Sequence, residues 1–181
     1  MKATGIVRRI DDLGRVVVPK EIRRTLRIRE GDPLEIFTDR DGQIILKKYS
    51  PIGELGAFSR EYSETLSQTS GHAVYIIDRD QVVAIAGASK KEFLNKRISD
   101  ELEDAITLRN PFGASKPDSA FVSILEEDDD PSYSHMFVAP IISEGDVIGA
   151  VIMTSPDKKM GEVESKLSIC AAAFLGKQME D

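Results

Sequence analysis

The sequence is poor in the residues that build disulfides, metal sites and membrane spans. Its one cysteine, Cys170, excludes a disulfide within the chain and fits a reducing cytoplasm. Its two histidines, His72 and His135, lie far apart and lack the ligand spacing of a zinc site. No stretch reaches the roughly 18–20 apolar residues of a membrane span, and the N-terminal segment lacks the apolar run of a secretory signal. We therefore expect neither a metal site nor a membrane association.

The sequence also lacks an arrangement of residues suited to catalysis. Ser134 and His135 are adjacent, but alternation along a strand would direct them to opposite faces, so they do not form a nucleophile–base pair. No G-x-x-x-x-G-K-[ST] phosphate-binding loop occurs. The acidic run at 126–130 lacks the ligand and glycine spacing of an EF-hand loop, which predicts a solvated loop. We expect a protein that is not an enzyme and that carries no cofactor.

Charge is distributed unevenly along the chain. The net charge is -7, yet residues 1–50 carry 12 lysines and arginines against 8 acidic residues, whereas residues 51–181 carry 12 against 23. A basic N-terminal region followed by an acidic remainder indicates two domains with different partners. Because the local field governs the binding of an anion, the overall pI of 5.0 does not exclude a nucleic-acid partner.

The first fifty residues alternate short β-branched segments with turn residues. A helix is expected from about Pro19 to Leu26, because proline suits the first helical turn. Strands are expected at Thr4–Ile10, Arg15–Val18, Leu34–Thr38 and Gln43–Tyr49, with turns at 11–14 and 39–42. A region of this size buries too little apolar surface to be stable alone. Two copies that exchange hairpins would complete each other's core.

Four basic residues recur at helical spacing within this region. Lys20, Arg23, Arg24 and Arg27 stand at i, i+3, i+4 and i+7, so in a helix they would share one face, where like charges repel. A plain solvated helix face is the alternative, because lysine and arginine are good helix formers. Taken alone, the row is equally consistent with a basic surface that follows DNA phosphates.

The segments TGIVRRIDDLGRVVVPKEIRRTLRI, GDPLEIF and DGQIILKKY resemble the AbrB family of bacterial transition-state regulators over about residues 1–50. The resemblance implies a domain-swapped β-hairpin dimer that binds double-stranded DNA. Carried over by motif, the DNA-contacting residues would be Arg8, Arg15, Arg23 and Arg24. Some antitoxins share such a domain, so an antitoxin-type DNA-binding autorepressor is the alternative. Antitoxins usually end in a short flexible tail, whereas this chain continues into a patterned body.

The remainder of the chain has the pattern of an α+β domain. A linker helix at 51–71 is expected to end at Gly71. We favour its pairing with the same helix of a partner chain, and packing on its own domain is the alternative. In the domain at 72–181, helices are expected between 90 and 108 and from about 161 to 179, and Arg109–Pro117 is expected to be a loop. Strands are expected at 73–78, 82–87, 120–126, 135–143 and 146–155. Such elements form a mostly antiparallel sheet with flanking helices.

The segments YIIDRDQVVAIAG and PIISEGDVIGAVIMTS make this second domain resemble a GAF domain. The resemblance implies a cleft for an unidentified small molecule, or a role in oligomerisation. The candidate ligand-binding residues are Asn110, Phe112 and Ser115, and a plain surface loop is the alternative. A cleft filled by its own side chains would favour oligomerisation alone.

The two halves together resemble the sporulation regulators of spore-forming bacteria. That resemblance implies an activator and repressor of sporulation genes in the forespore cytoplasm, assembled as a tetramer that is a dimer of dimers.

Overall fold

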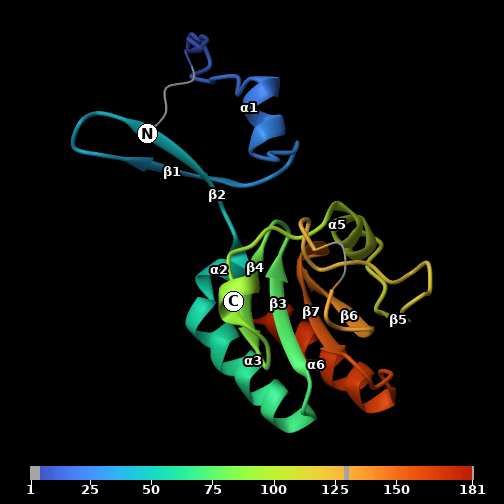
Figure 1. Ribbon diagram of the computed structural model, residues 1–181. Coiled ribbons are helices and arrows are strands. Elements are labelled where there is room, and N and C mark those ends of the chain that lie inside the picture. The colour runs from blue at the N-terminus through green and yellow to red at the C-terminus, as the bar shows by residue number, and fades with distance from the viewer. Residues whose placement is uncertain (1–4, 129–130, 181) are drawn as a thin grey trace. The chain divides into compact units, whose positions relative to one another are not determined.

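The computed structural model describes residues 5–128 and 131–180 and divides into two compact units (Figure 1). The first unit, which ends at Tyr49, is called the head, and the second, which begins at Ser50, is called the body. Within the described ranges, no helix combines the length and the apolar character needed to cross a membrane.

The head contains one short helix and one β-hairpin. Helix α1 (Lys20–Thr25) follows Pro19, whose φ of -57° already suits a helix start. Strands β1 (Leu34–Thr38) and β2 (Ile44–Lys48) pair antiparallel, with Ile36 opposite Leu46. The helix and the second hairpin predicted from the sequence are therefore confirmed.

The first predicted hairpin is wrong in the isolated chain, although its turn is formed. Thr4 lies outside the described residues, and residues 5–10 and 15–18 belong to no strand. The turn at 11–14 is closed by the N–H of Asp11, which donates to the carbonyl of Arg15 at 3.1 Å. A strand needs a hydrogen-bonded neighbour, and an isolated hairpin is marginal in water. These segments therefore form the turn of a hairpin without the hydrogen-bonded pairing of its strands.

The body is built on one five-stranded antiparallel sheet with the order β4-β3-β7-β6-β5. The strands are β3 (Ala73–Asp78), β4 (Val82–Ala86), β5 (Phe112–Ser115), β6 (His135–Ser143) and β7 (Asp146–Ser155). Strands β3, β4, β6 and β7 confirm the prediction from alternating β-branched residues. The central strand β7 pairs along its length with both β3 and β6.

The remaining strand corrects two sequence predictions. Phe112–Ser115, predicted to be part of a loop, forms the edge strand β5, with Phe112 opposite Val138. The segment 120–126, predicted to be a strand, makes only an isolated bridge at Leu125. Its backbone bonds elsewhere: the Ile124 carbonyl accepts from the Ser99 N–H at 3.0 Å, and the Ile124 N–H donates to the Tyr133 hydroxyl at 2.8 Å. The segment therefore covers the sheet instead of extending it.

Helices lie on both faces of the sheet. Side chains of α2 (Pro51–Glu54), α3 (Gly56–Ser70) and α6 (Glu162–Lys177) pack with Val74 and Ile76. Side chains of α4 (Lys90–Phe93) and α5 (Asp100–Thr107) pack with Tyr75 and Ile77 on the opposite face. This division follows from the alternation of side chains along β3. The body is thus a three-layer α+β domain with two cores.

The predicted linker helix is two helices that belong to the body. The Ser50 hydroxyl accepts from the Gly53 N–H at 3.0 Å and begins α2, and the chain turns at Leu55 before α3. Helix α3 ends at Gly71, whose φ of 72° is the left-handed conformation expected at a helix C-terminus. Leu66 of α3 is buried against the sheet, so this helix is anchored within its own chain.

Candidate nucleic-acid interface

The head has no buried side chain between residues 5 and 49. Its strands carry apolar residues all the same: Ile36 is 67% exposed and Ile44 is 71% exposed. In a stable domain such residues lie in a core, and a hairpin with one short helix does not supply one. The surface of the head is therefore both apolar and basic, which is typical of a protein that completes its core with another chain.

Five of the six predicted DNA-binding side chains are exposed. Arg8 precedes the first turn and Arg15 follows it, while Lys20, Arg23 and Arg24 lie on α1. On that helix, the spacing i, i+3, i+4 brings the three cations to one side. The structure thus confirms the helical row over its first three members. The exposure of all five leaves their charged groups accessible to an anionic partner.

Arg27 does not continue this row as predicted. Helix α1 ends before it, and Arg27 has a φ of 49°, in the left-handed region. The N–H of Ile28 donates to the carbonyl of Arg23 at 2.7 Å, and the N–H of Arg27 donates to that of Arg24 at 3.3 Å. These two bonds are the Schellman closure of a helix, in which the left-handed position is usually glycine. The half-buried Arg27 is therefore a helix-terminating residue in a strained conformation.

The segment after α1 is fixed by ionic contacts with β2. Lys48 donates from Nζ to the Arg27 carbonyl at 3.0 Å and lies 3.6 Å from a carboxylate oxygen of Asp32. Asp32 also accepts from the Arg29 N–H at 2.8 Å. Lys48 therefore helps to hold the helix end against the hairpin, in contrast to the exposed cations of α1.

Asp11 organises the turn that presents Arg15. Its Oδ1 accepts from the N–H groups of Leu13 at 3.0 Å and Arg15 at 2.7 Å, and its Oδ2 accepts from Arg15 Nε at 2.8 Å. The backbone N–H of Arg15, then its guanidinium, hold the pKa of the Asp11 carboxyl below its ordinary value. Asp11 was not among the residues singled out from the sequence. The available signal was the pattern D-x-x-G-x, which occurs at 11–15 and again at 39–43.

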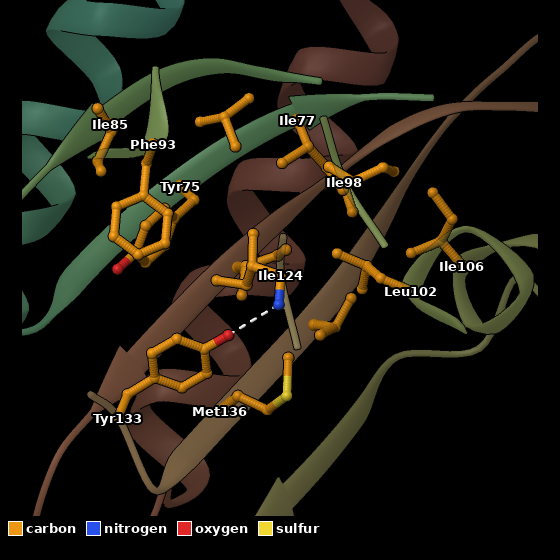
Figure 2. Close-up of a cluster of buried hydrophobic side chains, with 14 of the residues drawn as sticks. Tyr75, Ile77, Ile85, Phe93, Ile98, Leu102, Ile106, Ile124, Tyr133 and Met136 are labelled. Atoms are coloured by element: carbon orange, nitrogen blue, oxygen red, sulfur yellow. Dashed lines mark hydrogen bonds between the residues drawn. The ribbon is translucent and has the colours of Figure 1, made fainter. Parts of the chain in front are cut away.

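Side chains of the protein itself occupy much of the sheet face that packs with α4 and α5. Ile124, Met136 and Leu102 are fully buried there, and Figure 2 shows the Tyr133 hydroxyl directed at the Ile124 backbone nitrogen. Burial raises the pKa of Tyr133. This part of the face is therefore packed as a structural core.

The candidate ligand-binding residues do not converge on an open cavity. Asn110 is exposed, Phe112 packs against the filled cluster, and the Ser115 hydroxyl lies 2.8 Å from His135 Nδ1. A hollow of about 680 Å³ opens at the same face, with Tyr75, Phe93 and Tyr133 in its lining, and it contains none of the three candidate residues. Two of the serines that line this hollow are already engaged, because Ser67 donates to the His72 carbonyl and Ser70 to the Leu66 carbonyl.

No group of three potential metal ligands occurs in the part of the chain that the structure describes. The acidic run discounted from the sequence lies partly outside that part, because Asp129 and Asp130 are not among the described residues.

Known proteins resemble both units. Residues 54–180 match the family described as stage V sporulation protein T C-terminal, transcription factor, and residues 7–54 match antidote-toxin recognition MazE, bacterial antitoxin. Stage V sporulation protein T of Bacillus subtilis (strain 168) is 57% identical over 180 residues, which are 99% of each chain. The transition state regulatory protein AbrB of the same organism is 67% identical over 51 residues, which are 28% of this chain and 52% of AbrB.

A solved structure resembles the body in fold. The PixJ GAF domain of Thermosynechococcus elongatus superposes with a TM-score of 0.54 at 14% identity, over 72% of this chain and 90% of the other. At that identity the likeness shows the fold alone. The predicted architecture, an AbrB-type head and a GAF-like body, is confirmed by these comparisons. The chain belongs to the stage V sporulation protein T family, which is a family of transcription factors.

Proposed function

We propose that this protein binds double-stranded DNA through its head and both activates and represses sporulation genes in the forespore cytoplasm. The observation that carries the proposal is that residues 5–49 have no buried side chain and expose five cations, at 8, 15, 20, 23 and 24. Exposed arginines bind phosphates by releasing counterions, and they can also bind guanine with two hydrogen bonds. The names of the relatives, a sporulation protein and a transition state regulator, support the same function.

The DNA-binding form that we propose is a dimer with exchanged hairpins. Segments 5–10 and 15–18 already flank a formed turn and need neighbouring strands, which a second copy would supply. The apolar side chains then available for a shared core include Ile6, Val16, Leu26, Ile36, Ile44 and Leu46. A two-fold axis would duplicate every arginine, so that one surface contacts phosphates on both sides of a groove.

We further propose that the bodies pair these dimers into a tetramer. The rings of Phe58, Tyr62 and Phe174 contact one another between α3 and α6, with centroids 5.6–5.8 Å apart. Phe174 is 41% exposed and Val163 is 66% exposed on the same helix. An apolar helical face of this kind is suited to contact with a second body.

The antitoxin alternative rests on the head alone. The antitoxin-family match ends at residue 54, whereas the body is a folded domain with two cores and a transcription-factor match. The body is thus unlike the short flexible toxin-binding tail that usually ends an antitoxin.

The DNA-binding proposal is tested by replacing Arg23 and Arg24 together with alanine. We expect weaker duplex binding, and a slope of log K against log salt that is lower by about 1 for each phosphate that is no longer neutralised. The matched control is the double replacement of Lys158 and Lys159, two adjacent cations of the body that are also exposed. A slope unchanged in the arginine variant, with the oligomer intact by light scattering, would contradict the proposal.

The assembly proposal is tested by native mass spectrometry of the full chain. We expect a tetramer, and the Phe174→Ser variant should dissociate toward dimers while the head interface persists. A monomeric wild-type protein would contradict the exchanged-hairpin dimer.

A further inference from the structure

The head contains two turns with the same backbone hydrogen bonds, and the residue at the fifth position is charged in the first turn and uncharged in the second. The first turn is Asp11–Arg15 and the second is Asp39–Gln43. In both, the first N–H donates to the carbonyl four residues later, and the glycine N–H donates back to the aspartate carbonyl. Both glycines, Gly14 and Gly42, have a φ of 77°. One chain therefore provides an internal reference for what such a turn requires.

The aspartate side chain has the same structural role in each turn. Oδ1 of Asp39 accepts from the N–H groups of Asp41 at 3.0 Å and Gln43 at 2.9 Å, as Oδ1 of Asp11 does two and four residues ahead. An asparagine oxygen can make the same contacts. The negative charge is therefore not needed to form the turn.

The charge of Asp11 is explained by the residue at the fifth position. There the first turn has Arg15, and its Nε lies 2.8 Å from Asp11 Oδ2 in an ion pair. The second turn has Gln43, which carries no charge. One oxygen of Asp11 thus accepts the turn hydrogen bonds and the other binds the guanidinium. Of these two kinds of contact, Asp39 makes the first.

We propose that Asp11 is a positioning residue that holds Arg15 in the orientation for reading DNA and so gives the head its sequence preference. The inference rests on the proposed DNA binding by the head. Arginine has five N–H donors, and Asp11 occupies the one at Nε, which leaves the two terminal amino groups for a base edge or a phosphate. An arginine that is already oriented loses less rotational freedom on binding.

The same carboxylate opposes non-specific binding. A negative charge beside a DNA-contacting residue repels phosphates of every sequence, and only a duplex that offers Arg15 a good contact offsets this repulsion. Asp11 therefore lowers the affinity for arbitrary DNA while it favours contacts made by a fixed guanidinium. A residue that merely formed the turn would have neither effect.

The test compares Asp11→Asn with Asp39→Asn in the full-length protein. The probe is a short duplex pool with a randomised centre, and a second duplex is selected from this pool by the wild type. The measured quantity is the ratio of the two dissociation constants at one salt concentration. In Asp11→Asn we expect pool binding to strengthen about two- to threefold and the preference ratio to fall by roughly fivefold or more. Asp39→Asn, which changes the equivalent turn, should leave the ratio unchanged.

A double-mutant cycle separates positioning from turn stability. Arg15→Gln gives the first turn the fifth residue of the second, and in that background Asp11→Asn should leave the ratio unchanged. The inference is overturned if Asp11→Asn preserves or raises the ratio, or if the loss persists in the Arg15→Gln background. If Asp11→Asn fails to fold, the preference ratio of Arg15→Gln alone tests the inference. An unchanged ratio in that variant would mean that Arg15 does not read the sequence, so that Asp11 has no reading residue to position. Absence of salt-dependent pool binding by the wild type would instead refute the proposed DNA binding.

Discussion

The head and the body use similar apolar strands but bury them differently. Ile36 in β1 is 67% exposed, whereas Ile152 in β7 is fully buried. Strand β7 has a neighbour on each side and helices over both faces of its sheet, while β1 has one neighbour and no covering layer within its unit. The difference shows that alternating apolar and polar residues predict a strand, but do not show whether its apolar side chains are buried by the same chain or by another. The body obtains burial from its own chain, and we propose that the head obtains it from a second copy.

The largest expected effect is the loss of an apolar side chain from the body. Ile152→Ala should lower the free energy of unfolding of the body by about 2–5 kcal/mol, because it removes buried groups and leaves a cavity. The same change at Ile36 should have an effect of similar size on the head only if a partner buries that side chain. Urea denaturation followed by circular dichroism, at several protein concentrations, measures both. A negligible effect at Ile36 in the assembled protein would contradict a shared core.

Glycine substitutions should sharpen the contrast. A Cβ at Gly176 of α6 would collide with the backbone carbonyl of Ile142, so Gly176→Ala should destabilise the body by about 3 kcal/mol. Gly42 in the head has open space around it but a φ of 77°, so Gly42→Ala should cost only about 1 kcal/mol. Thermal denaturation of both variants compares a glycine required for space with one required for conformation. Equal losses would show that the helix shifts to accommodate the new methyl group.

Arg27→Gly should separate stability from binding within the head. Glycine adopts the left-handed conformation without strain, so the head should gain roughly 0.5–1 kcal/mol while DNA affinity falls through the loss of a cation. Thermal melting and a salt titration of duplex binding measure the two effects. Unchanged DNA affinity would remove Arg27 from the set of DNA-binding residues.

The smallest effect expected is a loss of body stability in acid. The Gly161 N–H donates to Glu164 Oε2 at 2.8 Å, and His72 Nε2 lies 3.4 Å from the other oxygen. Bonds from the Glu164 backbone, then from Gly161, hold the pKa of this carboxyl below its ordinary value. A lowered pKa stabilises the fold above the unfolded-state pKa, and this contribution is lost as pH falls through the folded-state pKa.

The Glu164→Gln variant tests this contribution. Between about pH 6 and pH 3, the wild type should lose about 0.5–1 kcal/mol more than Glu164→Gln. Thermal melting at each pH gives the difference, and parallel losses in the two proteins would contradict the role of the carboxylate.

The body strands predicted from the sequence were those with strong local signals. Strands β3, β4, β6 and β7 have runs of β-branched residues between turn residues. Strand β5 has the sequence FGAS, which is short and rich in small residues. It depends on pairing with residues of β6 that lie at least 20 positions away in the sequence. The segment 120–126 has the apolar composition of a strand. Its apolar side chains pack over the sheet instead, and its backbone belongs to no strand.

The candidate interface was predicted in its residue types and less well in its geometry. Motif resemblance located the arginines, and the structure confirms the exposure of five of the six predicted cations. Helical spacing placed Arg27 in the row because a period of 3.6 does not show where a helix ends. Asp11 was missed because an acidic residue in a basic region has an ordinary explanation as a turn former. Only the comparison of the two turns in three dimensions shows that the second carboxylate oxygen of Asp11 binds the Arg15 guanidinium.

The absence of buried residues between positions 5 and 49 has a consequence for biosynthesis. The head leaves the ribosome before the body, and synthesis of the body then takes on the order of ten seconds. During that time the apolar side chains of the head have no core within their own chain. Neighbouring ribosomes on one messenger RNA hold further nascent heads at high local concentration. We therefore expect hairpin exchange to begin during translation, so that each regulatory dimer forms from chains of one message, and dimers mixed after synthesis exchange subunits slowly.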